Sequence, residues 1–415
     1  MDLELVTVGT ELLLGFTLDT NGAEIARRLA GAGIRVVRRT AVGDRADEIR
    51  DGVADALRRT GAVLTTGGLG PTRDDITKVA VAGLYGAPFD FDETVWADLL
   101  ARFARLGRAP VASNRTQAEV PRGAVVLRNR WGTAPGLWLD GTPGLTIMLP
   151  GIPQEMRMLL EHEVMPRLAS RAGAAVIRSR TVRTTGIAES TLAERMGDVE
   201  TEIAPLTLAY LPGLDGVDLR LTAWQLAEDE AERRLSAAAE LLAARGGEHV
   251  YGEGETDLAA VVLERARHAG WSLGTAESCT GGLVGGRLTE VPGSSDVFQG
   301  SVVCYSNRLK TELVDVPPAL IEAHGAVSEP VARAMAEGAC RRLSVDLAVA
   351  VTGVAGPGGG TPEKPVGLVW FAAADRNGTV ARSSVVLGTR REIRARAAQA
   401  ALNLLRIRLP ALPAR

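Results

Sequence analysis

The sequence predicts an α/β protein with two three-layer α/β domains joined by a small α+β connector domain. Over the first 170 residues, short apolar runs alternate with amphipathic stretches, which is typical of a parallel sheet with helices on both faces. The same alternation returns from about residue 256. Between these regions, two half-buried strand patterns precede a long helix rich in Ala, Glu and Arg. We therefore predict domains over 1–169, 170–250 and 256–415.

The first domain follows a β-α-β-α-β order and then adds one strand and one helix. Its strands are predicted over residues 3–8, 34–37, 63–66 and 145–149. Its helices are predicted over residues 21–32, 46–59 and 154–169. Gly33 ends the first helix, and Gly67 with Gly68 ends the third strand.

The connector and the last domain follow in the same way. In the connector we expect strands over 177–185 and 217–222 and a helix over 226–245. The polar, glycine-containing segment 250–257 is expected to be a linker, after which Thr256 or Asp257 caps a helix through His268. The last domain is expected to have strands over 272–276, 302–305, 347–352, 366–373 and 383–387, and helices from 280, over 331–343 and over 391–408.

Composition and charge exclude several classes of function. The net charge of −3 and the absence of a basic tract argue against direct contact with nucleic acid. No apolar run approaches the length of a membrane span, and the N-terminus has no signal-peptide pattern. Three cysteines and four histidines show neither a disulfide framework nor metal-ligand spacing. We therefore expect a cytoplasmic protein that binds neither membrane nor nucleic acid.

Arginine greatly outnumbers lysine in this chain: there are 44 arginines and only three lysines, Lys78, Lys310 and Lys364. Arginine serves a solvated surface as well as lysine does, but only lysine can become neutral near physiological pH and act as a base. Each lysine lies in or beside a segment whose pattern suggests chemistry. A bias toward arginine codons is the alternative explanation, and Lys310 is the strongest candidate for proton transfer.

The segment AESCTGG (276–282) places a nucleophile candidate between a strand and a helix. Ser278 lies at this turn, and the N–H groups of Thr280, Gly281 and Gly282 are expected at the helix N-terminus, where they would stabilise negative charge. Two alternatives stay open. Ser278 could only cap the helix, or Cys279 could be the nucleophile if its thiolate were favoured.

Two further segments are expected to lie near Ser278. CYSNRLK (304–310) places Tyr305 and Lys310 at the end of a neighbouring strand, where Lys310 can deprotonate a serine and Tyr305 can relay a proton. A strand-end tyrosine with a solvated hydroxyl is the alternative. The glycine-rich loop 351–367 permits close backbone approach to a ligand. The last helix begins with three candidates for phosphate binding, Arg390, Arg391 and Arg394. For any one of them, a solvated helix face is the favoured alternative.

The first domain carries a second constellation in TTGGLGPTRDDITK (65–78). Gly67, Gly68 and Gly70 allow backbone N–H groups to approach an anion, and Thr72 adds a hydroxyl. Asp74 and Asp75 offer hard oxygen ligands suited to a divalent ion that bridges to phosphate. The alternative is that both aspartates cap a helix.

The C-terminal motifs together resemble the nicotinamide-nucleotide amidohydrolase domain of the CinA family. They are AESCTGG, YSNRLK, GAVSEPVA and GVAGPGGGTPEKPVG, and they cover 256–415. The resemblance implies hydrolysis of nicotinamide mononucleotide to nicotinate mononucleotide and ammonia without a cofactor, with Ser278 as nucleophile and Tyr305 and Lys310 as its partners. It also implies substrate contacts by Thr280, Gly281, Gly282, Asn307, Thr352, Gly353, Gly356, Gly358, Gly359 and Arg394.

The N-terminal motifs resemble the molybdopterin-binding-like domain of the same family. They are GTELLLG, DTN, VGD, GGLGPTRDD, SNRTQAEVPRGA and MLPGIPQEM, and the middle segments TGIAESTLAERM and LAYLPGLDGVDLRLTA resemble its connector. The resemblance implies cleavage of ADP-ribose to AMP and ribose 5-phosphate with a divalent metal of the Mg or Co type held by Asp74 and Asp75. It implies nucleotide contacts by Gly67, Gly68, Gly70, Thr72 and Asn114.

Other uses of the chain stay open alongside this bifunctional enzyme. The N-terminal domain could bind a pterin or nucleotide without turnover, because fold alone does not separate the two activities. The chain could also be an accessory protein in competence or DNA damage. We expect a homodimer that acts on nicotinamide mononucleotide and ADP-ribose.

Overall fold

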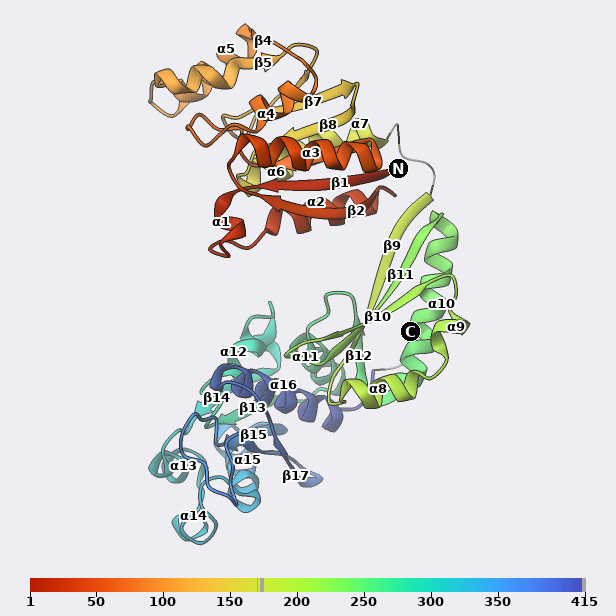
Figure 1. Cartoon of the computed structure of the whole chain (residues 1–415). Helices are drawn as coiled ribbons and strands as arrows, with labels where there is room; N and C mark the ends of the chain where they lie inside the picture. The colour runs from red at the N-terminus through yellow and green to blue at the C-terminus, as the bar shows by residue number, and fades with distance from the viewer. Residues whose placement is uncertain (170, 172–174, 413–415) are drawn as a thin grey trace. The chain divides into compact units, whose positions relative to one another are not determined.

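The chain forms two compact units (Figure 1). Both combine sheets with helices, in agreement with the α/β class predicted from the sequence. The computed structural model describes residues 1–169, 171 and 175–412. The first unit contains Met1–Arg178 and Ala223–Arg234, and the second contains Ser179–Thr222 and Leu235–Arg415. The predicted domain boundary at residue 170 lies outside the described residues. In the described part of the chain, no helix is long and apolar enough to cross a membrane.

The first unit is built on a six-stranded sheet of order β2-β1-β3-β8-β7-β6. Four strands are parallel: β2 (Arg35–Val42), β1 (Asp2–Val8), β3 (Ala62–Thr66) and β8 (Gly144–Leu149). Two antiparallel strands, β7 (Gly136–Gly141) and β6 (Val125–Leu127), extend one edge. The predicted parallel core is confirmed. Since β1, β3 and β8 are neighbours, the loops that follow them meet at one end of the sheet.

Helices cover both faces of this sheet, and each face has its own apolar core. One face packs α2 (Thr20–Gly31) and the helix that begins with α6 (Pro153–Leu159) and ends with α7 (Met165–Ala169). The other face packs α3 (Ala46–Thr60), α4 (Thr77–Leu84) and α5 (Glu93–Arg105). Apolar residues recur at helical spacing along α3, where Ile49, Val53 and Leu57 are buried, so its amphipathic pattern fixes its face.

Lys78, one of the three lysines, stabilises the packing of α4. Its ammonium donates hydrogen bonds to the carbonyls of Thr116 and Glu119, at the end of η1 (Ala112–Ala118) and the start of β5 (Glu119–Pro121). The side chain is only 7% exposed. Burial lowers the pKa of Lys78 to about 8. Lys78 is therefore not a surface charge; it links two segments of the first unit.

Burial of Lys78 predicts a stability that rises with pH. Between about pH 8 and the usual lysine pKa near 10.4, the folded state releases the proton while the unfolded chain keeps it, so the free energy of unfolding increases with pH. Below pH 8 both states are protonated, and the cost of the buried charge is constant. From pH 7 to pH 10, wild type should gain about 2 kcal/mol relative to Lys78→Met in urea titrations. A pH-independent difference between Lys78→Met and wild type would contradict the assignment.

The connector forms a four-stranded sheet of order β10-β11-β9-β12. Its strands are β10 (Thr207–Pro212), β11 (Val217–Ala227), β9 (Ala175–Thr184) and β12 (Val250–Glu253). The helix α10 (Glu228–Gly246) follows β11, and α8 (Glu189–Met196) and α9 (Val199–Glu202) lie between β9 and β10. The predicted linker over 250–257 is wrong in its first half, because β12 pairs with β9 and buries Tyr251. Two residues of high strand propensity, Val250 and Tyr251, outweigh the glycines that follow them.

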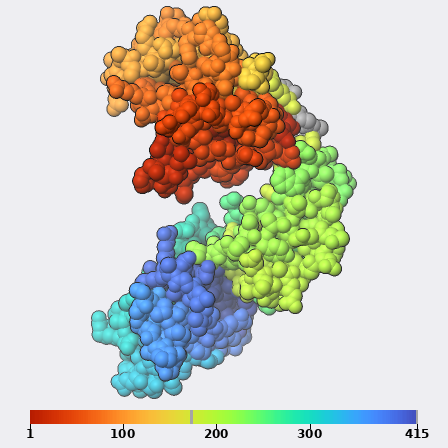
Figure 2. All heavy atoms as spheres, viewed as in Figure 1, coloured from red at the N-terminus to blue at the C-terminus, as the bar shows by residue number. Residues whose placement is uncertain are grey.

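The C-terminal domain, coloured cyan to blue in Figure 2, belongs to the same unit as most of the connector. It is a second three-layer structure. Its sheet has the order β14 (Phe298–Val303), β13 (Leu273–Glu277), β15 (Leu347–Gly353), β16 (Leu368–Asp375), β17 (Gly378–Val385). The first three strands are parallel and the last two antiparallel. One face packs α11 (Leu258–Ala269), α12 (Leu283–Thr289) and α16 (Arg390–Arg408), and the other packs α13 (Asn307–Val314), α14 (Pro318–His324) and α15 (Glu329–Leu343).

Candidate active sites

The C-terminal candidate site lies where the parallel strands β13, β14 and β15 end together. The N–H of Ser278 donates to the carbonyl of Val351 (2.9 Å), and the N–H of Cys304 donates to the carbonyl of Glu277 (2.9 Å). Parallel pairing therefore brings the segments after Glu277, Val303 and Val351 to the same sheet edge. This is the position at which open α/β sheets bind their ligands.

Ser278 and Lys310 form a buried pair at this edge. The Nζ of Lys310 lies 3.1 Å from the Oγ of Ser278. Lys310 is 1% exposed and Ser278 is 7% exposed. Lys310 comes from α13, whose N-terminus is capped by the Ser306 hydroxyl accepting from the N–H of Leu309. The structure therefore places these two residues, which the sequence predicts to converge, in direct contact.

The surroundings of Lys310 favour its neutral form. Burial lowers the pKa of the ammonium, and no carboxylate among the described residues forms an ion pair with it. Two of its contacts are carbonyl oxygens, those of Cys304 (3.0 Å) and Tyr305 (3.2 Å). A neutral amine has two N–H bonds and one lone pair. If the carbonyls accept the two N–H bonds, the lone pair faces the Ser278 hydroxyl and can accept its proton.

Cys279 has the environment of an inert thiol. Its side chain is 5% exposed and belongs to the apolar core under α16. Burial raises the pKa of the Cys279 thiol to about 11, so the nucleophilic thiolate is scarce at neutral pH. Of the two candidate nucleophiles, only Ser278 contacts a base.

Glu277 was not predicted as a site residue, yet it fixes the turn that carries Ser278. It is fully buried, and its carboxylate accepts from the N–H groups of Gly282 (2.9 Å), Val284 (3.1 Å) and Gly285 (2.8 Å). The helix was expected to begin at Thr280 and to offer its N-terminus to an anion. It begins instead at Leu283, and Glu277 already occupies its free N–H groups. An acidic residue directly before the nucleophile was the available signal, because carboxylates favour helix N-termini.

Two of the three arginines that open α16, Arg390 and Arg394, hold loops, while Arg391 is exposed. Arg394 donates to the carbonyls of Cys279 (3.0 Å) and Thr280 (2.7 Å), and so fixes the nucleophile turn from outside. Arg390 donates to the carbonyl of Gly356 (2.8 Å) and to the hydroxyl of Tyr305 (3.3 Å). The sequence predicted that Arg394 binds phosphate. In the structure its guanidinium group also holds the turn that carries Ser278, which was not predicted.

Three other predicted residues have no side-chain hydrogen bond to Ser278 or Lys310 in the described part of the chain. The Tyr305 side chain is 60% exposed, and only its carbonyl reaches Lys310; its hydroxyl faces Arg390. Asn307 is exposed at the first position of α13. The Thr352 hydroxyl donates to the carbonyl of Ala326 (2.8 Å), which ties β15 to the loop before α15. The strand β14 ends before Tyr305, and its exposed side chain places its hydroxyl against Arg390.

The glycine-rich loop after β15 is anchored at both ends and open in the middle. Lys364 donates to the carbonyl of His324 (2.6 Å), and Arg390 holds Gly356. A Cβ at Gly358 or Gly359 would meet nothing within 4 Å, whereas one at Gly353 would come within 2.8 Å of the Leu368 carbonyl. The open glycines leave room for a ligand, while Gly353 is required by packing.

One buried hydroxyl at the turn has no partner. Thr280 is fully buried, and its Oγ1 accepts and donates no hydrogen bond among the described residues. Such orphaned groups are rare in folded proteins and are often satisfied by a bound molecule. Thr280 lies two residues from Ser278, so this hydroxyl is a candidate contact to substrate.

The N-terminal candidate site is a pocket of about 440 Å³ at the ends of β1, β3 and β8. Gly67, Gly68 and Gly70 line it as predicted, together with Gly151 from the loop after β8. A Cβ at Gly67 would come within 2.2 Å of the Val8 carbonyl, and Gly67 has a φ of 109°. This glycine is therefore required for the loop to turn at the end of β3.

Asp74 and Asp75 both line this pocket but cap no helix, because α4 begins later, at Thr77. Asp75 accepts hydrogen bonds from the N–H (2.8 Å) and the hydroxyl (2.5 Å) of Thr72, so Thr72 orients a carboxylate. Among the described residues, no three acidic, histidine or cysteine side chains come close enough together to hold a metal ion by themselves. The donor set still suits Mg²⁺, which commonly takes one or two carboxylates, water and substrate phosphates.

Three further acids line the pocket and were not predicted as site residues: Glu11, Asp44 and Glu155. Glu155 is 7% exposed and accepts from the amide of Asn129 (2.5 Å), and burial raises the pKa of its carboxyl. Asp44 accepts from the N–H of Thr10 (2.8 Å). Each acid lies in one of the motifs GTELLLG, VGD and MLPGIPQEM, so the signal was present in the sequence.

Asn114 does not line this pocket. Its carbonyl oxygen accepts from the N–H of Val111 (2.9 Å), and its amide donates to the side chain of Gln117 (3.1 Å). These contacts cap η1, the short helix that Lys78 also contacts. The amide is satisfied within its own segment.

Comparison with known families divides the chain into the same three regions. Residues 4–170 match the probable molybdopterin binding domain, 179–252 match the damage-inducible protein CinA KH domain, and 255–409 match the CinA C-terminal domain. Together these matches cover both candidate sites and the connector.

Full-length relatives support the same assignment. The chain is 52% identical over 410 residues to a CinA-like protein of Gemmatimonas aurantiaca, covering 98% of this chain and 96% of the relative. It is 45% identical over 416 residues to a putative competence-damage inducible protein of Symbiobacterium thermophilum, covering 97% of each. A crystal structure of the competence/damage inducible protein CihA from Agrobacterium tumefaciens is 43% identical, covers 36% of this chain and 91% of that chain, and has a TM-score of 0.35. From the three domain matches and the full-length relatives, this chain belongs to the CinA family.

Proposed function

We propose that the C-terminal domain hydrolyses the carboxamide of nicotinamide mononucleotide, with Ser278 as nucleophile and Lys310 as general base. The observation that carries this proposal is the 3.1 Å contact between the Ser278 hydroxyl and a buried lysine amine. Amide hydrolysis needs a nucleophile that is activated and then a proton for the departing nitrogen. One neutral lysine can perform both transfers.

The two half-reactions then balance without a cofactor. The Ser278 oxygen bonds to the carboxamide carbon while Lys310 takes the hydroxyl proton. Lys310 returns that proton to the amide nitrogen as the carbon–nitrogen bond breaks, and ammonia leaves an ester on Ser278. Water then attacks the ester, Lys310 takes a proton from water and gives it to the Ser278 oxygen, and the nicotinate product leaves. Arg394 and Glu277 hold the turn throughout, and we propose that the Thr280 hydroxyl contacts the substrate.

Product analysis tests this proposal directly. Purified protein is incubated with nicotinamide mononucleotide, and ammonia and nicotinate mononucleotide are measured with and without a chelator. Equal amounts of both products, unaffected by the chelator, are expected, because no step uses a metal. The absence of both products would remove the proposed function.

We propose that the N-terminal domain cleaves ADP-ribose to AMP and ribose 5-phosphate with a divalent metal. Asp74 and Asp75 would hold the metal, which would neutralise charge on the pyrophosphate. Thr72 orients Asp75, and the glycine loop 67–70 lets backbone N–H groups approach a phosphate. The buried Glu155, whose carboxyl pKa is raised, is suited to move a proton to or from the attacking water.

Replacing Asp74 and Asp75 together by asparagine is expected to lower ADP-ribose cleavage by orders of magnitude. Asparagine keeps the size of each side chain but removes both charges. Since neither aspartate caps a helix, the thermal midpoint should change little. Chromatographic assay of AMP measures the effect, and Asp47→Asn/Asp51→Asn on the exposed side of α3 serves as a control with the same change in charge. Cleavage at the wild-type rate by the Asp74/Asp75 variant would refute the metal role.

The main alternative for this domain is a binding module that holds a pterin or a nucleotide without turnover. The five acids around the pocket favour hydrolysis assisted by a metal over the binding of an anion alone, because an anion would be repelled without a cation. Tight binding of ADP-ribose with no AMP formed in the presence of Mg²⁺ or Co²⁺ would favour the alternative.

We also propose that the chain does not bind nucleic acid directly, although its connector matches a KH domain. KH domains hold the nucleic-acid backbone with a G-x-x-G loop. In the connector, the turn between α8 and α9 is Gly197-Asp198, and α9 continues with Val199 and Glu200, so this turn has no second glycine. The G-x-x-G that the connector does contain, Gly213-Leu214-Asp215-Gly216, lies in the β10–β11 hairpin rather than between two helices, and it carries an acid. Arg245, which neighbours the α8–α9 turn, is already bonded to Glu202. A role in competence or DNA damage would therefore use a protein partner.

A further inference from the structure

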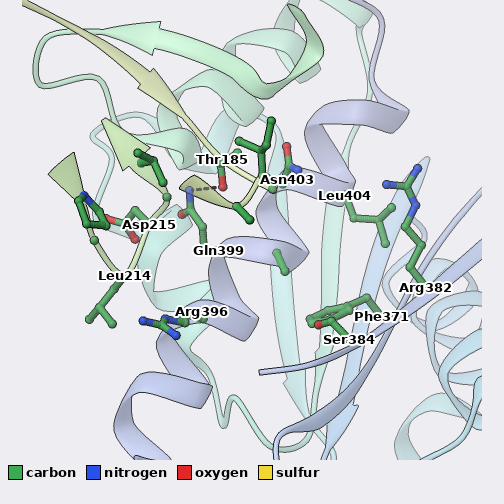
Figure 3. Close-up of a pocket in the computed structure, with 18 of the residues that line it drawn as sticks. Thr185, Leu214, Asp215, Phe371, Arg382, Ser384, Arg396, Gln399, Asn403 and Leu404 are labelled. Carbon is green, nitrogen blue, oxygen red and sulfur yellow. Dashed lines mark hydrogen bonds between the residues drawn. The ribbon is translucent and has the colours of Figure 1, made fainter. Parts of the chain in front are cut away.

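A second cavity, of about 650 Å³, lies within the second unit between the connector and the C-terminal domain (Figure 3). Its walls are the loop after β9 (185–189), the β10–β11 hairpin (212–217), the strands β16 and β17, and α16. The hairpin depends on Gly216, where a Cβ would come within 1.9 Å of the Thr184 carbonyl. The volume is in the range of small-molecule sites and suits a mononucleotide. Neither proposed reaction uses this cavity.

The cavity has an apolar wall and two cationic groups. Phe371, Leu404 and Ile407 provide apolar surface from β16 and α16. Arg382 of β17 and Arg396 of α16 line the same cavity, and both side chains are exposed. Neither forms an ion pair among the described residues, and Arg396 uses one nitrogen to bond the carbonyl of Leu387 (3.0 Å). An apolar wall with unpaired guanidinium groups matches a flat organic molecule that carries a phosphate.

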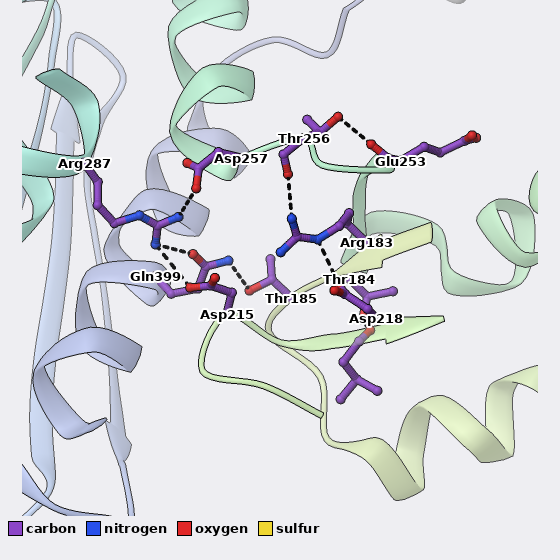
Figure 4. Close-up of polar contacts among 11 residues, drawn as sticks. Arg183, Thr184, Thr185, Asp215, Asp218, Glu253, Thr256, Asp257, Arg287 and Gln399 are labelled. Carbon is purple, nitrogen blue, oxygen red and sulfur yellow. Dashed lines mark hydrogen bonds and ion pairs between the residues drawn. The ribbon is translucent and has the colours of Figure 1, made fainter. Parts of the chain in front are cut away.

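The acidic groups at this cavity do not cancel the arginines. Asp215 lies 3.5 Å from Arg287, which also pairs with Asp257 at 2.8 Å (Figure 4). The remaining carboxylate in the lining, Glu189, is exposed at the start of α8. With Asp215 paired, the lining residues offer a ligand the charge of Arg382 and Arg396, opposed by this exposed group. Outside the lining, Glu392, one turn earlier on α16, also attracts Arg396.

The cavity is physically connected to the nucleophile turn by two helices. Gln399 accepts from Arg287 (2.6 Å) and donates to Thr185 (3.1 Å), so it joins α16 and α12 to the cavity wall (Figure 4). At its other end, α12 is held by Glu277, the residue before Ser278. Along α16, Arg394 holds the nucleophile turn and Arg396 lines the cavity. A shift of α16 on ligand binding would therefore move a contact of the turn.

We propose that this cavity binds a nucleoside monophosphate, and that its occupancy changes the rate of the amide hydrolysis at Ser278. The phosphate would bind Arg396, and the base would lie against Phe371 and Leu404, beside Arg382 at the opposite end of the cavity (Figure 3). The effect on rate rests on the proposed amidase function, whereas the binding does not.

Binding is tested on the full-length protein by calorimetry with AMP, GMP, CMP and UMP, and with adenosine and inorganic phosphate for comparison. At least one nucleotide should bind more tightly than adenosine or phosphate. Its affinity at this site should fall at least tenfold in Arg382→Ala/Arg396→Ala, because hydrogen bonds to charged groups are among the strong ones. Arg376→Ala, in the exposed β16–β17 turn, removes one charge from the same sheet and should keep wild-type affinity. Hydrogen exchange should show nucleotide-dependent protection of 212–217 and 383–400.

Three outcomes would overturn the proposal: binding of none of the four nucleotides, equal affinity in wild type and the double arginine variant, or protection confined to the two active sites. Coupling is tested by adding the bound nucleotide to the ammonia assay, where it should change kcat or KM for wild type and not for the double variant. Nucleotide binding without any kinetic effect would overturn the coupling. If wild type releases no ammonia at all, the proposed amidase fails, and the calorimetric and exchange measurements still decide the binding site.

Discussion

Lys310→Arg is expected to lower the rate of ammonia release from nicotinamide mononucleotide by about 10²–10⁴-fold, the usual contribution of general-base catalysis. Arginine keeps the positive charge but cannot be deprotonated, and its planar head does not fit a fully buried amine site. The loss should appear in kcat, with a modest change in KM, because the contact of Lys310 is with Ser278. Steady-state kinetics measures both constants.

The pH profile supplies a second readout for the same lysine. The base is active when neutral, so kcat should rise with pH and level off below the usual lysine pKa near 10.4, since burial lowers the pKa of Lys310. Arg308→Ala, on the exposed side of the same helix, should keep the wild-type rate and profile. A Lys310→Arg enzyme within a few-fold of wild type would remove the lysine from proton transfer.

Ser278→Ala is expected to abolish ammonia release, because it removes the oxygen that forms the ester. Cys279→Ala should keep most of the activity, since the Cys279 thiol is buried, contacts no base and has a pKa raised to about 11. The two variants change neighbouring residues of one turn and differ in whether the lost atom contacts Lys310. Ammonia assay and mass spectrometry of the protein trapped with substrate measure the effect.

Loss of activity in Cys279→Ala with activity kept in Ser278→Ala would reverse the assignment of the nucleophile. Loss in both would point to collapse of the turn, which far-UV circular dichroism and the thermal midpoint would detect. The expected pattern also includes a covalent adduct in wild type that is absent from Ser278→Ala.

Much of the fold follows from local sequence pattern. Buried strands such as β1 and β15 read as short apolar runs, and helices such as α3 carry their apolar residues at helical spacing. The proximity of Ser278 and Lys310 could also be predicted from the sequence, because parallel strands bring successive loops to one sheet edge. The connector strand β12 was missed, since its pairing partner β9 is far away in sequence.

The remaining site residues depend on contacts that sequence order does not reveal. Arg394 reaches carbonyls that are 114 and 115 residues earlier in the chain, so its role in holding the turn could not be read from α16 alone. Tyr305 follows the end of β14. Its hydroxyl accepts a hydrogen bond from Arg390, which is 85 residues later in the chain, so the local sequence does not reveal the direction of the ring. The acids Glu11, Asp44 and Glu155 lie in three separate motifs, and only the folded sheet brings them to one pocket.

The scarcity of lysine has a practical consequence for amine chemistry. Lys78 and Lys310 are buried, so reagents such as N-hydroxysuccinimide esters can reach only the N-terminal amine and Lys364 in the folded protein. Coupling through Lys364 would cut its bond to the His324 carbonyl and would attach the label beside the glycine loop. Surface immobilisation or cross-linking of this protein through Lys364 would therefore perturb the glycine-rich loop after β15, and an introduced surface cysteine is the safer attachment point.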